Sequence, residues 1–351
     1  MIEENLLFEH SSPESITIIT TYKCTAACND CCFESNPKIK GKLDEAKIKD
    51  FILESYNSFK DLKVVIFTGG EPLLLGRSLF NCIEYASSFG LITRIVTNGY
   101  WGKTSVLAQK IAKNLKNANL SEINISTGLD HAQFVPIEHV INAIKALSEQ
   151  KIPNRVTVES DFEDGSFYKN LIEAPEVEKT LNINPGLLSF QINTWMPFHT
   201  DSETRKPPAL NTVDIPCTQL FSNLVLTPHG RVSSCCGLTF EHIDQLKIGY
   251  YQNGNLKDLY KSQFEDFLKI WINIDGPIGI IRKVMGEQFI ETLGDIHHLC
   301  QACALLHKDE RILNKLKDVY PLYIEEILSK YSKNIFLKKV KDELRVCKNE
   351  A

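Results

Sequence analysis

Short runs of β-branched and apolar residues alternate with longer amphipathic segments over roughly the first half of the chain. SITIIT (15–20) and KVVIFT (63–68) have the composition of buried strands, and residues 43–59 between them have the apolar spacing of a helix. The same alternation predicts further strands at 91–98, 122–127, 155–160 and 187–195. Buried strands that are joined by helices form parallel sheets with right-handed crossovers. Six such units predict an α/β fold, namely a partial (β/α)6 barrel of the TIM type.

The pattern changes after the sixth predicted strand. Residues 196–216 are rich in proline and polar side chains, which predicts an irregular connection out of the barrel. Residues 223–236 predict a β-hairpin with a Pro-His-Gly turn at 228–230, and from Leu256 the chain is predicted to be mainly helical. We therefore expect a barrel core over 1–200, a small auxiliary domain of a short hairpin and helices over 201–310, and a C-terminal helical segment over 311–351.

Composition and charge exclude several classes of partner. The 351 residues are 43 % hydrophobic, which allows a full core and exceeds the usual size of one compact domain. The net charge of -5 and the pI near 6.0 provide no basic field for nucleic acid. No apolar run approaches the length of about 20 residues that spans a bilayer, and no signal-peptide pattern is present. We expect a cytoplasmic protein without a membrane partner, whose 11 cysteines stay reduced.

Three of these cysteines are closely spaced in the loop after the first predicted strand. Cys24, Cys28 and Cys31 form a C-x3-C-x2-C pattern at the carboxyl end of the sheet, where parallel α/β folds bind ligands. A [4Fe-4S] cube that has three thiolate ligands keeps one iron open for another molecule. The alternatives are a zinc knot or three unrelated core thiols. Structural zinc, however, commonly has four protein ligands in two pairs. The adjacent Cys32 is expected to be a buried, inert thiol.

Residues 15 to about 195 resemble the radical SAM enzymes. The cysteine triplet matches the signature of that family, and Gly69-Gly70-Glu71-Pro72 after the second strand resembles its GGEP segment. The resemblance implies that the open iron chelates S-adenosylmethionine (AdoMet). It also implies that the GGEP backbone and the Glu71 carboxylate hold the methionyl ammonium, which suits a charge-assisted hydrogen bond. Reduction of the bound AdoMet would then yield methionine and a 5′-deoxyadenosyl radical.

Further positions resemble family contacts to AdoMet. They are Asn98 after the third strand and Ser126 and Thr127 after the fourth. One position departs from the family pattern. The residue before the last cysteine is usually aromatic or apolar and packs on the adenine, but here it is Asp30. Phe33 is the candidate replacement. The radical must not attack its own walls, so the barrel interior is expected to be dry and well packed.

A second cysteine set follows the barrel. Cys217 begins a C-x12-G-x4-C pattern that ends at Cys235, and Cys300 and Cys303 form a C-x2-C pair. The set resembles the SPASM or shorter twitch domains of peptide-modifying radical SAM enzymes. That resemblance implies one auxiliary [4Fe-4S] cluster, with either Cys235 or Cys236 as its second ligand. A zinc site is the alternative. Two other thiols, Cys82 and Cys347, are expected to be core or surface residues, and His297-His298 to flank the site.

The combination implies an enzyme that matures ribosomally made peptides. The first hypothesis is Cα epimerisation from L to D, in which Cys236, left over beside the cluster, returns a hydrogen atom to the peptide. The alternatives are thioether or carbon–carbon cross-link formation in a peptide, radical chemistry on a small metabolite, and a non-enzymatic iron–sulfur or zinc module. The expected partners are a ribosomal precursor peptide and an external electron donor of the flavodoxin or ferredoxin type.

Overall fold

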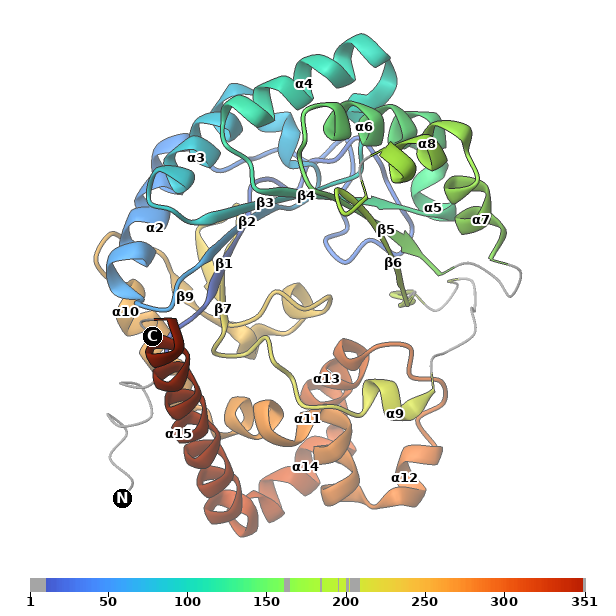
Figure 1. Ribbon diagram of the computed structural model, residues 1–351. Helices are drawn as coiled ribbons and strands as arrows, with labels where there is room; N and C mark the ends of the chain where they lie inside the picture. Colours follow the sequence, from blue (N-terminus) through green and yellow to red (C-terminus); the bar gives the residue numbers. More distant parts are fainter. Residues whose placement is uncertain are drawn as a thin grey trace.

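A twisted sheet of mainly parallel strands forms the centre of the protein in the computed structural model (Figure 1). The structure describes residues 11–160, 165–183, 185–194, 196–199, 202 and 209–349. The strand order is β6-β5-β4-β3-β2-β1-β7-β8-β9, and the first six strands pair in parallel, which confirms the predicted partial barrel. These strands are β1 (Ser15–Ile19), β2 (Val64–Thr68), β3 (Ile92–Thr97), β4 (Glu122–Thr127), β5 (Asn154–Glu159) and β6 (Leu188–Asn193).

Amphipathic helices cover the outer face of these strands (Figure 1). In the first helix after β1, the buried residues Ile48, Phe51, Ile52 and Ser55 recur at the spacing of one helical face. Its N-cap, Asp44, accepts a hydrogen bond from the Lys47 amide at 2.8 Å. The helices between the strands are α2 (Glu45–Ser58), α3 (Arg77–Ser88), α4 (Ser105–Asn117), α5 (Leu129–Ala132), α6 (Ile137–Glu149), α7 (Ser166–Ile172) and α8 (Pro175–Ile183).

The predicted hairpin extends the barrel sheet. Strands β7 (Asn223–Leu226) and β8 (Arg231–Ser233) are antiparallel, and β9 (Lys247–Tyr250) pairs with β8. Strand β7 also pairs in parallel with β1, with Ile16 opposite Leu224. Because β1 would otherwise be an edge strand, β7 supplies the ladder partners that its backbone requires. The domain division at residues 200 and 310 stays a prediction.

A helical lobe lies across the barrel from the outer helices (Figure 1). Its longest internal helix, α11, is kinked at Gly276, which has a φ of 71° and precedes Pro277. Helix α10 (Leu256–Ser262) lies beside α2 and β9. The helices of the lobe are α9 (Leu210–Val213), α11 (Phe267–Met285), α12 (Glu287–Glu291), α13 (Leu299–Lys308), α14 (Glu310–Val319) and α15 (Ile324–Asn349). Short 3-10 turns complete the fold: η1 (Pro72–Leu75), η2 (Tyr100–Lys103), η3 (Phe240–His242), η4 (Asp244–Leu246), η5 (Gln263–Glu265) and η6 (Tyr320–Tyr323).

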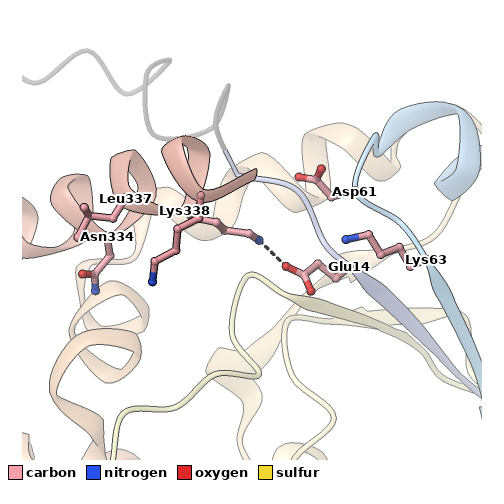
Figure 2. A pocket seen from close by; sticks show the side chains of 7 residues that line it. Glu14, Asp61, Lys63, Asn334, Leu337 and Lys338 are labelled. Atoms are coloured by element: carbon pink, nitrogen blue, oxygen red, sulfur yellow. Dashed lines mark hydrogen bonds and ion pairs between the residues drawn. The ribbon is translucent and has the colours of Figure 1, made fainter. Parts of the chain in front are cut away.

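Helix α15 returns to the amino ends of the strands. Lys338 forms an ion pair with Glu14, which directly precedes β1, and together with Lys63 these side chains line a charged cavity of about 390 Å³ (Figure 2). The hydrogen bond from Lys338 lowers the pKa of Glu14. This cavity lies at the end of the strands that does not carry the cysteine loop. None of the helices in the described part of the chain is long and apolar enough to cross a bilayer.

Candidate active site

A cavity of about 440 Å³ opens at the carboxyl ends of the strands. The cysteine loop between β1 and α2 forms one wall, and the inner faces of β2 to β6 form another. The segment after β6 and the residues after the hairpin also contribute, because Met196, Phe198, Cys236 and Leu238 line the same space. The fold therefore brings residues from both cysteine regions of the sequence to one cavity.

Cys24, Cys28 and Cys31 all line this cavity. Cys24 accepts hydrogen bonds through its sulfur from the Ala26 amide at 3.4 Å and from Asn98 Nδ2 at 3.5 Å. Burial raises the pKa of Cys24 to about 11 and also raises the pKa of Cys28. Burial disfavours a thiolate unless a cation compensates its charge, and an iron–sulfur cluster supplies that compensation. The chemistry of these three donors fits a cluster with one open iron.

Gly69 and Gly70 line the cavity where they cross the cysteine loop. The Gly70 amide donates to the Thr21 carbonyl at 2.7 Å, and the Glu71 amide donates to the Lys23 carbonyl at 2.9 Å. A Cβ on Gly69 would lie 2.4 Å from the Thr21 oxygen, and one on Gly70 would lie 2.3 Å from the Lys23 oxygen. The two glycines therefore allow the GGEP segment to touch the backbone that presents the cysteines.

We expect Gly70→Ala to lower the free energy of unfolding by about 1–3 kcal/mol, because the added methyl would collide with the backbone of Lys23. Gly279→Ala in α11 is a matched control. Its Cβ would meet Asp275 Cβ at 3.5 Å, an ordinary contact, so alanine should be neutral or slightly stabilising in that helix. Urea unfolding of both variants in the same cluster state measures the difference. Equal stabilities would contradict the proposed clash.

Glu71 is completely buried, and its carboxylate points toward the end of β3. It accepts hydrogen bonds from the Thr97 hydroxyl at 2.9 Å, the Asn98 amide at 3.0 Å and the Leu73 amide at 3.1 Å. Burial raises the pKa of Glu71 to about 7. Glu71 does not line the cavity, whereas the resemblance assigns its carboxylate to the methionyl ammonium. In this arrangement Glu71 holds the start of η1 against the Thr97-Asn98 turn.

The remaining predicted AdoMet contacts divide between the cavity and its surroundings. Asn98, Ser126 and Phe33 line the cavity, whereas Pro72 and Thr127 do not. Asn98 also donates to the Thr25 hydroxyl at 3.0 Å, which ties the end of β3 to the cysteine loop. Thr127 is buried, and its hydroxyl has no hydrogen-bond partner among the described residues.

The second cysteine set meets between the hairpin and α13. Gly237 lies against two of its sulfurs, because a Cβ there would be 2.8 Å from Cys300 Sγ and 3.1 Å from Cys235 Sγ. The Gly237 amide donates to Cys235 Sγ at 3.0 Å. Burial raises the pKa of the four thiols that the resemblance assigns to the auxiliary cluster, namely Cys217, Cys235, Cys300 and Cys303. Neighbouring thiols add to the rise in pKa for Cys235, Cys300 and Cys303.

The adjacent residues Cys235 and Cys236 differ in their exposure to the barrel cavity. Both cysteines lie near Cys217 and Cys300, but Cys235 is buried whereas Cys236 lines the barrel cavity. The Cys236 thiol donates to Gln219 Oε1 at 2.9 Å, and burial raises its pKa to about 11. Cys32 also lines the cavity and is not an isolated core thiol, because its surroundings include Cys31 and Cys300. The arrangement places Cys32 and Cys236, two thiols outside the cysteine triplet, at the wall of the barrel cavity.

Polar side chains lie among the apolar ones that line the barrel interior, and the expected dryness stays a prediction. Arg94 on β3 pairs with Glu122 on β4, and Thr157 donates to Asn124 Oδ1 at 2.8 Å across β4 and β5. The sequence indicates this polar inner face, because polar residues occupy every second position of EINIST (122–127). His131 and Glu159 form a pair at the cavity wall. The sequence pattern does not indicate this pair, because His131 lies in α5 and Glu159 ends β5.

No three His, Cys, Asp or Glu side chains in the described ranges are gathered as closely as one metal ion requires. The assignment of ligands to either cluster accordingly remains a prediction. It rests on the cysteine patterns and on the burial of the thiols. It also rests on the close approach of Gly70 to the backbone of the cysteine loop and of Gly237 to two cysteine sulfurs.

Comparison with known sequences matches the first part of the chain. The Radical SAM superfamily profile matches residues 18–162. YydG of Bacillus subtilis (strain 168), whose name assigns it provisionally to peptide biosynthesis, is 26 % identical over 132 residues, which are 38 % of this chain and 41 % of YydG. A PqqA peptide cyclase of Xanthomonas campestris pv. campestris (strain B100) is 30 % identical over 124 residues, 34 % of this chain and 31 % of the cyclase. Each match spans less than half of the relative.

Solved structures share the fold over most of the chain. The structure of anSMEcpe with bound AdoMet superposes with a TM-score of 0.52 and 15 % identity, over 86 % of this chain and 98 % of that one. The anSMEcpe complex with AdoMet and a Cp18Cys peptide gives a TM-score of 0.51 and 14 % identity, over 87 % of this chain and 99 % of that one. Identities this low concern the fold alone. The profile match identifies residues 18–162 as a radical SAM domain, and the cysteine triplet and the parallel strands of this region agree with that identification.

Proposed function

We propose that the protein matures a ribosomally made peptide, with Cα epimerisation as its reaction. The observation that carries this proposal is the position of Cys236, which lines the same cavity as Cys24, Cys28 and Cys31 and is left free when Cys235 is taken as the ligand of the auxiliary cluster. Two relatives with names from peptide biosynthesis support a peptide substrate. The polar inner face of β4 and β5 also suits the amide groups of a peptide backbone.

The residues that would hold the cofactors fit them chemically. Cys24, Cys28 and Cys31 would bind the first [4Fe-4S] cluster. The four ligands of the auxiliary [4Fe-4S] cluster would be Cys217, Cys235, Cys300 and Cys303. When bound, the first cluster and AdoMet supply a 5′-deoxyadenosyl radical, for which an external flavodoxin or ferredoxin provides the electron. The protein orients AdoMet through the backbone of Gly69 and Gly70 and through Asn98 and Ser126, all of which line the cavity.

Cys236 would complete the epimerisation. After a hydrogen atom has been removed from one face of a peptide Cα, the Cys236 S–H bond breaks and its hydrogen atom forms the new C–H bond on the other face. The sulfur is left as a thiyl radical, which regains the thiol by taking one electron from the external donor and one proton from solvent. Gln219 orients the thiol by accepting its hydrogen bond.

Cross-link formation is the second candidate. The similarity to a PqqA peptide cyclase favours it over chemistry on a small metabolite. To separate the candidates, the reconstituted enzyme is incubated with AdoMet, a reductant and either peptide or small-molecule pools, and 5′-deoxyadenosine and product masses are measured. Epimerisation leaves the peptide mass unchanged in ordinary water, whereas a cross-link lowers it by about two hydrogen atoms. Turnover only with small molecules would refute the peptide proposal.

We expect Glu71→Gln to weaken AdoMet binding by about 1–3 kcal/mol while the absorbance of the clusters persists. The amide nitrogen of glutamine would face an N–H donor of Leu73 or Asn98 and displace the turn that brings Asn98 to the cavity. Calorimetric titration with AdoMet measures the loss. Glu45→Gln, which changes a carboxylate on the outer surface of α2, is the control. Unchanged affinity would show that AdoMet binding does not depend on the turn that Glu71 holds.

A further inference from the structure

Asp30, which departs from the radical SAM pattern, contacts a segment far away in the sequence. The Phe198 amide donates to Asp30 Oδ1 at 2.6 Å, and the Ser202 hydroxyl donates to the same oxygen. Asp30 lies between Cys28 and Cys31 in the cysteine loop, whereas Phe198 and Ser202 follow β6. One carboxylate oxygen therefore joins the first loop of the barrel to the connection that leaves its last parallel strand.

Further hydrogen bonds join the described residues after β6 (196–199 and 202) around this contact. The His199 amide donates to Ser202 Oγ at 3.1 Å, and the Ser202 amide donates to the His199 carbonyl at 3.2 Å. Ser202 therefore has a fixed hydroxyl that accepts from His199 and donates to Asp30. Met196 is buried, and both Met196 and Phe198 line the cavity beside the cysteines. The Phe198 ring also lies 5.7 Å from the His242 ring of η3.

We propose that Asp30 is a positioning residue that fastens the segment after β6 over the adenine end of the AdoMet site, where Phe198 supplies the apolar contact. A carboxylate cannot itself provide the packing that an aromatic or apolar residue at this position would give. By holding the Phe198 amide, Asp30 instead fixes an aromatic ring beside the same loop. The proposal rests on the AdoMet site of the proposed function but not on its peptide substrate.

Phe33 is less suited to this contact. Its ring centroid lies 6.1 Å from that of Tyr22 and 6.0 Å from that of Phe240, so two aromatic neighbours already hold it. Tyr22 is in turn tied by a hydrogen bond to Glu241, beyond the hairpin. Phe33 thus belongs to the packing between the cysteine loop and η3, and Phe198 is the aromatic residue that Asp30 positions.

The test measures AdoMet affinity of the reconstituted protein by equilibrium binding, together with the change that AdoMet causes in the electron paramagnetic resonance spectrum of the reduced cluster. We expect Asp30→Ala to bind AdoMet about tenfold more weakly, because two hydrogen bonds to the segment are lost. Asp30→Asn keeps Oδ1 as an acceptor for both donors and should stay within about threefold of the wild type. The Asp30→Asn variant thus distinguishes the loss of the hydrogen bonds from Phe198 and Ser202 from the loss of the negative charge.

Two variants outside the cysteine loop keep the test decisive if Asp30→Ala fails to hold its cluster. Phe198→Ala should weaken AdoMet binding about tenfold with full cluster absorbance, and Ser202→Ala should weaken it less, because the Phe198 amide still binds Asp30. Phe33→Leu, although the residue lines the cavity, should weaken AdoMet binding less than Phe198→Ala does. Wild-type affinity in Phe198→Ala, a loss in Asp30→Asn as large as that in Asp30→Ala, or a larger loss in Phe33→Leu than in Phe198→Ala would each overturn the proposal.

These measurements need no peptide, so the two proposals can fail separately. A wild-type protein that binds AdoMet and shows the pattern above, yet modifies no peptide, would refute the proposed function and support the role of Asp30. A protein that epimerises a peptide but binds AdoMet equally well with Asp30→Ala and Phe198→Ala would refute the role of Asp30 alone.

Discussion

Replacement of any one of Cys24, Cys28 and Cys31 by alanine is expected to abolish reductive cleavage of AdoMet while the barrel stays folded. Two thiolates cannot hold a cube whose fourth iron must stay open for AdoMet. The cysteine loop lies between β1 and α2, outside the hydrogen-bonded strands, so the sheet does not depend on it. The assay is formation of 5′-deoxyadenosine under reducing conditions, with circular dichroism as the check on folding.

Iron and sulfide analysis distinguishes a lost cluster from a damaged fold. The wild type should contain about eight irons and eight sulfides per chain after anaerobic reconstitution, and each of the three variants about four. Cys32→Ala is the matched control, because the residue is adjacent to Cys31 and lines the same cavity but is not a predicted ligand. Cleavage of AdoMet by a triple alanine variant would refute the assignment. Zinc without sulfide in the wild type would refute both clusters.

The parallel barrel could be predicted from the sequence because its signal is local. Each βα unit has an apolar run and an amphipathic run within about 30 residues. The spacing of apolar residues in the strand differs clearly from that in the helix. The pairing of β7 with β1 has no such signal. It joins residues about 200 positions apart, and it depends on which edge of the finished sheet is left open.

The same limit applies to the site. Motif spacing identifies Gly69-Gly70-Glu71 as a loop at the carboxyl end of β2, but it does not say where the side chain points. The Glu71 carboxylate turns to Thr97 and Asn98 because two donors at the end of the next strand and the nearby Leu73 amide converge on it. The partner of Asp30 could not be predicted either, since Phe198 lies in a polar, proline-rich connection without periodicity. Residue types were readable from the sequence, whereas the contacts that orient them are long-range.

The Cys236→Ala variant is expected to cleave AdoMet but to lose epimerised product almost completely. A thiol exchanges its proton with solvent, so in deuterated water the wild type should leave one deuterium at Cα of the modified residue. The thiol is placed for this step, since it lines the cavity and its hydrogen bond to Gln219 fixes the sulfur at 2.9 Å from Oε1. Mass spectrometry of the peptide and chiral analysis of its hydrolysed amino acids measure the two outcomes.

Cys236→Ser separates hydrogen-atom donation from packing. Serine keeps the size and the hydrogen-bond donor toward Gln219, but its O–H bond is too strong to give a hydrogen atom to a carbon radical, so this variant should fail as alanine does. Cys32→Ala, which changes another thiol at the cavity, should epimerise normally. If Cys236→Ser or Cys236→Ala turns over at the wild-type rate with deuterium at Cα, then Cys236 is a packing residue. Thioether or carbon–carbon cross-linking, in which no thiol has to return a hydrogen atom, would then be the better account of the cavity.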